Sequence, residues 1–418
     1  MAPGGLTLDA RAGSGRREAL AWLLALAAGW ALLAVLDYKA RDPDSRLYSE
    51  IAARMARQPL ARWVAPEFPP GWYMSGPFRE HPAGLFFPAA ALADLGYPAE
   101  QAAYAMNALY QVLTLVLLQR LAAAVADGVA ARALGWLLQL VPIAFTFRIR
   151  ANQEQAVLLC LVAALVGLER VRRRPAWAVL TAAALAGLVL VKGLFALLGP
   201  ALCALWLLAR STSVAPEQRA DGRAWLALGL GTAAALAVAG GYEAWYRDVT
   251  GEAFWSPYLG RQLGVAAATG PAAALASAPL LARKAYNLVW YLGRVIWFAF
   301  PWSLVLLLAS VRRSFPGGHA AVTKARSGAI FALATVILYL LVFSAFDRRA
   351  DRYLFPAYYA AAAAGAAFAL CASSRFRRLA ERLDRPWVPA AVWLVTFLLH
   401  VAGGRIGVPT VKVWTADR

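Results

Sequence analysis

Long apolar segments recur along the whole chain, and they constrain its fold more than any other feature. A helix that spans a bilayer needs about 20 mostly apolar residues. Of the 418 residues, 61% are hydrophobic and only 16% are charged, which is typical of a polytopic membrane protein and leaves no room for a large soluble domain. We expect an all-α fold of about eleven transmembrane helices, at residues 19–36, 99–121, 132–148, 155–170, 176–191, 193–209, 224–243, 286–309, 327–345, 353–371 and 387–403.

The net charge is +19, and the distribution of the basic residues indicates the orientation in the membrane. A nucleic-acid-binding protein would carry one continuous basic surface, whereas here the arginines form short clusters between apolar segments. With the N-terminus in the cytoplasm, all the clustered inner connections are basic, as the positive-inside rule requires. The clusters contain Arg132; Arg170, Arg172, Arg173 and Arg174; Arg210, Arg219 and Arg223; Arg312, Arg313, Lys324 and Arg326; and Arg375, Arg377, Arg378, Arg382 and Arg385. Nucleic acid is therefore not an expected partner.

The chain is expected to form one transmembrane domain, residues 1–403, followed by a short outer tail, residues 404–418. The first apolar segment, residues 19–36, is long for a signal peptide and has no convincing cleavage site after it. We therefore interpret it as a retained first span.

Two long connections, residues 37–98 and 244–285, are expected on the outer side. Long connections that carry unusual residues often carry function. The first contains two amphipathic stretches, 45–58 and 83–95, which we expect to lie along the membrane interface. The apolar face of the first stretch is expected to comprise Leu47, Tyr48, Ile51 and Met55.

Two aspartates, Asp42 and Asp44, stand where the first amphipathic stretch begins. Asp42 before Pro43 has the pattern of a helix N-cap followed by proline at the first helical position. Asp44 would favour the positive end of the same helix. A carboxylate in this position could instead act as a general base. The sequence pattern alone does not decide between a capping role and a catalytic role for either aspartate.

Arg79, Glu80 and His81 come just before the second amphipathic stretch. A charged rim at the membrane interface is the structural interpretation. An acid next to one of only three histidines could instead supply a general base or part of a metal site. Two ligands are a weak signal for a metal, so a divalent metal at Glu80 and His81 stays an open alternative, and no other cofactor is indicated.

Several basic residues are expected at the outer face, where such residues are usually few. Lys192, followed by Gly193, interrupts two apolar segments. This lysine either snorkels to the interface or binds a phosphate. The segments 148–155 and 346–356, the second of which contains Arg352, bring further arginines outward. Together these cations predict an anionic ligand.

In chain order, these motifs resemble those of the membrane-embedded glycosyltransferases of the C superfamily. The resemblance is greatest to the branch that includes lipid A aminoarabinose transferase and the protein O-mannosyltransferases. The family's acidic motif after the first span, D-E-x-x-Y-x-x-I-A, is matched at Asp44, Tyr48, Ile51 and Ala52. Ser45 departs from it by replacing the second acid.

The family's later motifs follow in the same order. Its F-E-K-P-P-L motif resembles residues 78–85, where Glu80 and Pro82 match and His81 replaces the lysine. The L-T-K-G-P motif resembles residues 190–194, which contain Lys192. Its R-Y-x-x-P motif is matched at Arg352, Tyr353 and Pro356, and its P-W-S motif at Pro301, Trp302 and Ser303.

The resemblance implies an enzyme that moves a hexose or pentose from a polyprenyl-phosphate-linked donor to a glycan, lipid or protein acceptor. The reaction would take place at the outer face of the bacterial cytoplasmic membrane. Asp44 is the expected general base, and Glu80 is the second expected catalytic residue. The expected substrate-binding residues are Asp42, Tyr48, Arg79, His81, Lys192, Arg352 and Tyr353.

Two other functions remain open: a lipid-linked sugar flippase or transporter, and an O-antigen ligase or polymerase. A transporter would be expected to have broken helices at mid-membrane and paired internal repeats, neither of which is clear in the sequence. A ligase or polymerase would depend mainly on arginines. The ordered motifs around Asp44 and Glu80 favour the transferase.

Overall fold

The structure is a computed structural model that describes residues 6–40, 42–72, 74–213, 219, 221–264, 279–312, 319–346 and 349–406. Helices form most of this part of the chain. Within it, the one β contact is an isolated bridge between Glu67 and Pro77. The predicted all-α class is confirmed.

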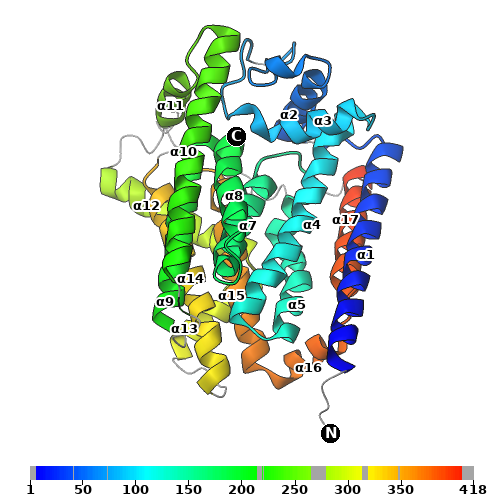
Figure 1. Ribbon diagram of the computed structural model, residues 1–418, viewed down its shortest axis with the longest axis vertical. Helices are drawn as coiled ribbons and strands as arrows, with labels where there is room; N and C mark the ends of the chain where they lie inside the picture. Colours follow the sequence, from blue (N-terminus) through cyan, green and yellow to red (C-terminus); the bar gives the residue numbers. More distant parts are fainter. Residues whose placement is uncertain are drawn as a thin grey trace.

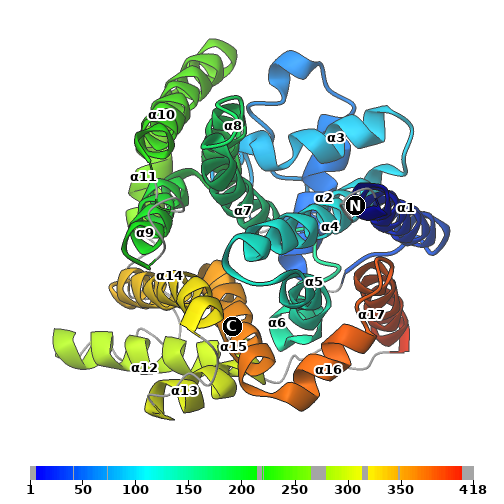
Figure 2. The ribbon, with the colours of Figure 1, turned by 60° about the horizontal axis from the view of Figure 1, so that its bottom comes forward.

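Most of the long helices run along the long axis of the molecule (Figure 1). They are α1 (Leu6–Val35), α4 (Ala99–Val125), α7 (Glu154–Val171), α8 (Trp177–Lys192), α9 (Leu198–Ser213), α10 (Gly222–Thr250), α14 (His319–Ser344), α15 (Phe355–Ala372) and α17 (Val388–Ile406). Viewed from another direction, α4, α7, α8 and α10 are neighbours in that order (Figure 2). Small residues permit this packing: a Cβ on Gly167 of α7 would lie 2.4 Å from Thr181 Oγ1 of α8.

Two of the expected spans are broken rather than straight. Residues 132–148 form α5 (Gly128–Leu137), η3 (Leu138–Leu140) and α6 (Pro142–Thr146). Residues 286–309 form α12 (Leu280–Phe298) and α13 (Trp302–Arg312), which are bent by 112° relative to each other. Among the described residues, six stretches are long and apolar enough to cross a membrane, or seven with this bent pair. The number of eleven crossings stays a prediction.

One of those six stretches, Trp177–Ser211, contains two helices that run in opposite directions. Lys192, at the end of α8, bonds to Glu154 at the start of α7. Arg210, near the end of α9, bonds to Glu169 near the end of α7. Between them, the 3-10 helix η4 (Gly193–Leu197) makes the turn. These contacts therefore agree with the prediction that residues 176–191 and 193–209 are two separate spans.

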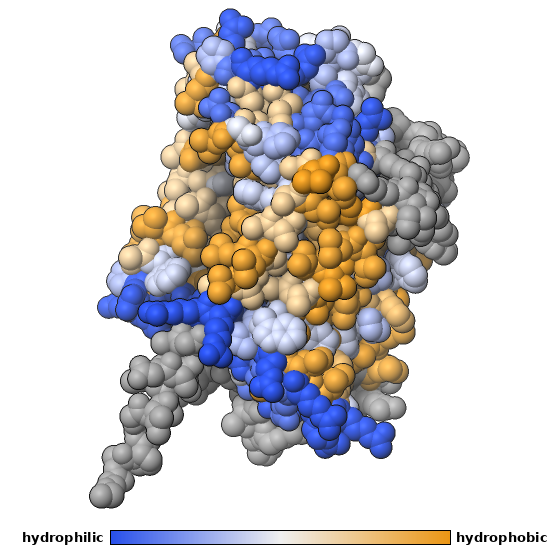
Figure 3. All heavy atoms as spheres, turned by 90° about the vertical axis from the view of Figure 1, so that its right-hand side faces the viewer, coloured by the Kyte–Doolittle hydropathy of each residue, from blue (hydrophilic) through white to orange (hydrophobic). Residues whose placement is uncertain are grey.

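Shorter helices gather at the two ends of the bundle. At the upper end in Figure 1 lie α2 (Pro43–Met55), α3 (Phe87–Asp94) and α11 (Trp255–Gly264). At the lower end lies α16 (Ser374–Arg382). On the face shown in Figure 3, hydrophobic residues form a band between two hydrophilic ends. This distribution is the one expected of a protein that crosses a bilayer.

The two amphipathic stretches form helices at the upper end. The first is α2, whose Leu47, Tyr48, Ile51 and Met55 are buried, as predicted for its apolar face. The second comprises η2 (Ala83–Leu85) and α3, which packs against α4. The short η1 (Leu60–Arg62) lies in the same connection.

The second outer connection begins later along the chain than expected. Helix α10 continues to Thr250, so the second outer connection begins later than residue 244 and then forms α11. Residues 407–418 of the expected outer tail lie outside the described part, as do residues 265–278 of the second connection.

Candidate active site

An ion pair joins two of the predicted site residues across most of the chain. Asp44 lies in the first turn of α2, and Arg352 lies in η7 (Asp351–Leu354), directly before α15. Arg352 Nη1 donates a hydrogen bond to Asp44 Oδ2. The Asp44 side chain is 42% exposed, so this carboxylate is also accessible from outside the bundle.

A second ion pair lies deeper beside the same element. Lys192 Nζ, at the end of α8, is 3.3 Å from Glu154 Oε1, at the start of α7. The two side chains are only 6% and 2% exposed. Glu154 Oε2 has no hydrogen-bond partner within the described residues. A buried ion pair of this kind requires good geometry, because both charges lose their hydration.

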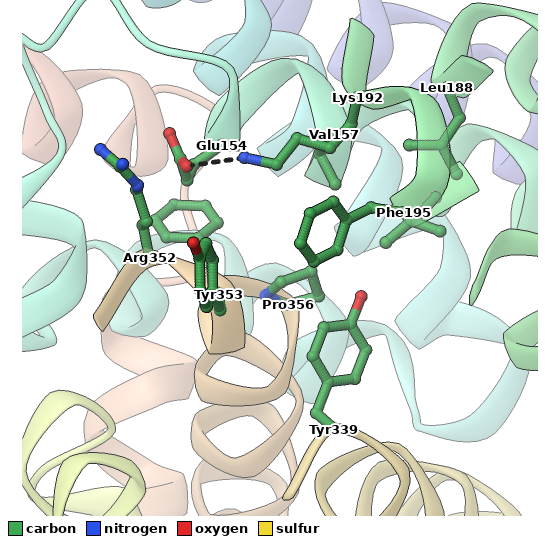
Figure 4. A pocket seen from close by; sticks show the side chains of 11 residues that line it. Glu154, Val157, Leu188, Lys192, Phe195, Tyr339, Arg352, Tyr353 and Pro356 are labelled. Carbon is green, nitrogen blue, oxygen red and sulfur yellow. Dashed lines mark hydrogen bonds and ion pairs between the residues drawn. The ribbon is translucent and has the colours of Figure 1, made fainter. Parts of the chain in front are cut away.

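A pocket lies against these charges (Figure 4). Glu154, Lys192, Arg352 and Tyr353 supply its polar groups. The remaining lining is mostly apolar and comprises Val157, Leu161, Leu188, Phe195, Tyr339, Phe355 and Pro356. Its empty space is about 360 Å³, including the part open to solvent. This division of polar and apolar groups matches the chemical character of a ligand with an anionic head and an apolar body.

Helix η7 is held in place from several sides. Arg294 Nε of α12 is 2.9 Å from Asp351 Oδ1, and both residues are buried. The Tyr358 hydroxyl donates to the Asp351 backbone oxygen at 2.9 Å. The Tyr353 ring stacks on Phe343 with centroids 5.3 Å apart. These contacts set the position from which Arg352 reaches Asp44.

The start of α2 is fixed by a cap. Asp42 Oδ1 accepts a hydrogen bond from Ser45 N at 3.0 Å, with Pro43 at the first helical position. The capping interpretation of Asp42 is therefore confirmed. Arg150 Nε lies 3.9 Å from the other carboxylate oxygen of Asp42. A contact between Asp42 and substrate stays a prediction.

Tyr48, one turn after Asp44 on α2, belongs to an aromatic cluster. Its ring packs against Phe86 and Phe78, with centroids 5.5 and 6.0 Å away, and against His81 at 6.4 Å. Burial, and then the charge of Asp44, raise the pKa of the Tyr48 hydroxyl well above its usual range. Tyr48 thus supports α2 in this structure, and its predicted contact with substrate is untested.

Arg79, Glu80 and His81 belong to the first outer connection. Their side chains contact α10, α11 and the residue directly before α7. Arg79 bonds to the Tyr246 hydroxyl at 2.9 Å and to Glu252. Glu80 Oε1 is 3.3 Å from Arg261 Nη2 of α11.

His81 Nε2 is 3.1 Å from Gln153 Nε2. None of Arg79, Glu80 and His81 lines the pocket; Asp44 does not line it either, but it bonds to Arg352, which does. No group of three or more His, Cys, Asp or Glu side chains that could hold a metal occurs in the described part of the chain. Catalysis by Glu80 therefore stays a prediction.

Residue-level reasoning missed Glu154 and misplaced Arg148. The segment 148–155 was predicted to matter for its arginines. Its only acid, Glu154, is the residue that pairs with Lys192. A single acid at the outer start of an apolar segment was the available signal. Arg148 was expected at the outer surface, which is wrong: it is 2% exposed and lies inside the bundle, where its guanidinium donates a hydrogen bond to the Gln139 backbone oxygen.

No protein-family model matches the chain, and no curated protein sequence matches it. Solved structures nevertheless have a similar fold. ArnT from Cupriavidus metallidurans bound to undecaprenyl phosphate matches with a TM-score of 0.65 and 16% identity, over 94% of this chain and 77% of ArnT. Its apo state matches with a TM-score of 0.62 and 17% identity, over 94% and 78% of the two chains.

A second protein matches more loosely. The archaeal oligosaccharyltransferase AglB from Archaeoglobus fulgidus, in complex with an inhibitory peptide and a dolichol-phosphate, gives a TM-score of 0.50 and 15% identity. The match covers 93% of this chain and 56% of AglB. ArnT and AglB are both C-superfamily glycosyltransferases, so the predicted fold is confirmed. At these identities the likeness is one of fold.

Proposed function

We propose that the protein is a glycosyltransferase that moves a sugar from a polyprenyl-phosphate-linked donor to the hydroxyl of an acceptor. The observation that carries the proposal is the pairing of Asp44 with Arg352 beside a pocket that also contains Lys192. Two proteins of this fold have been solved with a lipid phosphate, which supports the same class of ligand here.

The two cations are suited to a phosphate in a partly dry site. A phosphate removed from water requires charged hydrogen-bond donors, which Arg352 and Lys192 can supply. In the structure, Asp44 and Glu154 neutralise these cations. A donor phosphate would take over part of that role, while the apolar lining, such as Leu188 and Phe195, would contact the start of the lipid chain.

The transfer step then uses Asp44 as the general base. The acceptor oxygen attacks the anomeric carbon, the bond from that carbon to the phosphate oxygen breaks, and the hydroxyl proton passes to the Asp44 carboxylate. Arg352 and Lys192 stabilise the negative charge on the released polyprenyl phosphate. Asp44 suits this role better than Glu154, because Asp44 is exposed to an incoming acceptor and Glu154 is buried. Glu154 orients Lys192.

We place this reaction at the outer face of the cytoplasmic membrane. The site lies at the end of the bundle that carries α2 and α11, opposite the basic helix α16. Basic residues concentrate on the cytoplasmic side of membrane proteins. The acceptor would then be a glycan, a lipid or a protein that reaches the outer leaflet, and the sugar a hexose or a pentose.

A transfer assay tests the proposal. Purified protein in lipid nanodiscs is incubated with radiolabelled polyprenyl-phosphate sugars and a panel of acceptors. Asp44→Asn is expected to lower kcat by about 10²–10⁴-fold, the usual contribution of a general base. Glu50→Gln is the matched control: Glu50 lies on the same helix and accepts a hydrogen bond from the Trp72 indole at 2.7 Å, away from the pocket.

The outcomes separate the alternatives. Transfer at full rate by Asp44→Asn removes Asp44 from the role of base. With the same protein reconstituted into sealed liposomes, movement of the labelled lipid across the bilayer, with no transfer product from any donor and acceptor, would identify a flippase instead.

A further inference from the structure

A second pocket lies inside the bundle and shares no lining residue with the first. Its polar lining comprises Gln111 and Thr114 of α4, Gln139 of η3, Arg148, Gln155 of α7 and Tyr359 of α15. The gaps between its lining atoms total about 260 Å³, including the part open to solvent, but they leave room for only about one sphere the size of a water molecule. In Figure 2, α5 and α6 lie beside α4. The lining residues come from α4, η3, α6, α7 and α15 and from the segment directly after α6.

Arg148 brings a full positive charge into this pocket. Its Nη2 donates to the Gln139 backbone oxygen at 2.8 Å, and its guanidinium lies 5.4 Å from the centre of the Phe145 ring. Its Nε has no hydrogen-bond partner, and no carboxylate pairs with it among the described residues. An arginine in a protein does not lose its proton, so the charge must be balanced in another way.

Two other buried arginines show the usual solution. Arg210 Nη2 is 3.0 Å from Glu169, and Arg294 Nε is 2.9 Å from Asp351. Buried charges in proteins are generally paired, because an isolated ion in a medium of low dielectric is strongly unfavourable. Arg148 is the exception among these three and lacks the carboxylate that the other two have.

The pocket contains further polar atoms without partners. Thr114 Oγ1 and Gln139 Oε1 are buried and make no hydrogen bond within the described part of the chain. Buried polar groups are almost always hydrogen-bonded. Arg148 Nε and Thr114 Oγ1 can both donate to a bound acceptor, whereas Gln139 Oε1 would accept a hydrogen bond from water.

We propose that this pocket binds a small monovalent anion of halide size, held by Arg148 and Thr114. Water would satisfy the hydrogen bonds but would leave the charge of Arg148 unbalanced. A phosphate dianion would exceed the single cation of the pocket. The proposal is independent of the transferase reaction, since the two pockets have no lining residue in common.

The bound anion would tie two parts of the bundle together. Arg148 follows α6, and Thr114 belongs to α4. Occupancy is therefore expected to stabilise the folded state as any ligand of the native protein does, in proportion to ln(1 + [L]/Kd).

The test compares chloride with an anion too large for the pocket. Full-length protein is purified in sodium gluconate, and its Tm is followed by tryptophan fluorescence as chloride replaces gluconate at constant ionic strength. Wild type is expected to show a saturable rise in Tm. Arg148→Gln is expected to lose this rise, and Thr114→Val to need more chloride for it. Arg120→Gln, which alters an exposed arginine of α4, is expected to keep it.

A direct readout covers the case in which Arg148→Gln does not fold. Crystals of the wild-type protein grown in bromide are expected to show an anomalous peak in contact with the Arg148 guanidinium. Absence of this peak, together with a Tm that does not depend on chloride, would overturn the proposal. An equal response of Arg148→Gln and wild type to chloride would overturn it as well, because the effect would then be a general one of salt.

Discussion

Each of the two cations in the proposed donor pocket is paired with a carboxylate from a different helix. Asp44 and Glu154 come from the starts of α2 and α7, and Arg352 and Lys192 come from the segments that face them. The starts of helices carry partial positive charge, which also favours these two acids. The arrangement keeps the cations ready for an anion without leaving their charges unbalanced in its absence.

The buried pair makes a sharp prediction about stability. Lys192→Met leaves the Glu154 carboxylate buried without its cation, and we expect this to lower the free energy of unfolding by about 3–5 kcal/mol. The double variant Lys192→Met/Glu154→Gln should recover most of that loss, because no charge is then buried unpaired. Denaturation in mixed micelles measures both. Equal losses in the single and double variants would mean that the pairing does not stabilise the fold.

At the scale of elements, the start of α2 determines where Asp44 lies. Asp42→Ala removes the acceptor for Ser45 N and is expected to cost about 1 kcal/mol, while Asp42→Ser keeps a capping oxygen and most of the stability. The same pair of variants tests the predicted substrate contact, because Asp42→Ser removes the charge but retains the cap. A raised KM for the donor in a stable Asp42→Ser variant would establish that contact, and an unchanged KM would leave Asp42 as a cap only.

The turn after α8 is a second element on which the site depends. Gly193 has φ 56° and ψ −114°, a conformation that other residues rarely adopt, and a Cβ there would lie 2.5 Å from the Tyr258 hydroxyl oxygen. This hydroxyl accepts a hydrogen bond from Leu194 N at 3.0 Å. Gly193→Ala should cost about 1–3 kcal/mol and weaken donor binding by displacing Lys192.

The control for that variant is on the same helix. A Cβ on Gly187 would meet nothing closer than Cys160 Sγ at 3.4 Å, and Gly187 has no positive φ. Gly187→Ala is therefore expected to keep both stability and donor binding. The turn at Gly193 would lose its proposed importance if the two variants unfolded at the same temperature and bound the donor equally well.

At the scale of the whole molecule, the orientation in the membrane can be tested by labelling. Replacing the three native cysteines and introducing Ser75→Cys at the upper end or Arg378→Cys on α16 gives two single-cysteine proteins with exposed sites. A thiol reagent that cannot cross the membrane should label Ser75→Cys in intact cells and Arg378→Cys after lysis only. The reverse pattern would place the proposed active site on the cytoplasmic side.

Local properties of the chain were enough to predict the class of fold, the positions of most helices and the cap at Asp42. Apolar length, basic connections and the spacing of capping residues act over a few turns of helix, so they can be read without knowing the partners of each segment. The buried face of α2 followed in the same way, from the periodic spacing of Leu47, Tyr48, Ile51 and Met55.

The pairing of charges required the packed structure. Asp44 meets Arg352 across 308 residues, Glu80 meets Arg261 rather than the pocket, and Arg148 turns into the bundle instead of outward. Which carboxylate meets which arginine depends on how helices distant along the chain pack. Several outer arginines were available to each acid, and no local pattern distinguishes among them.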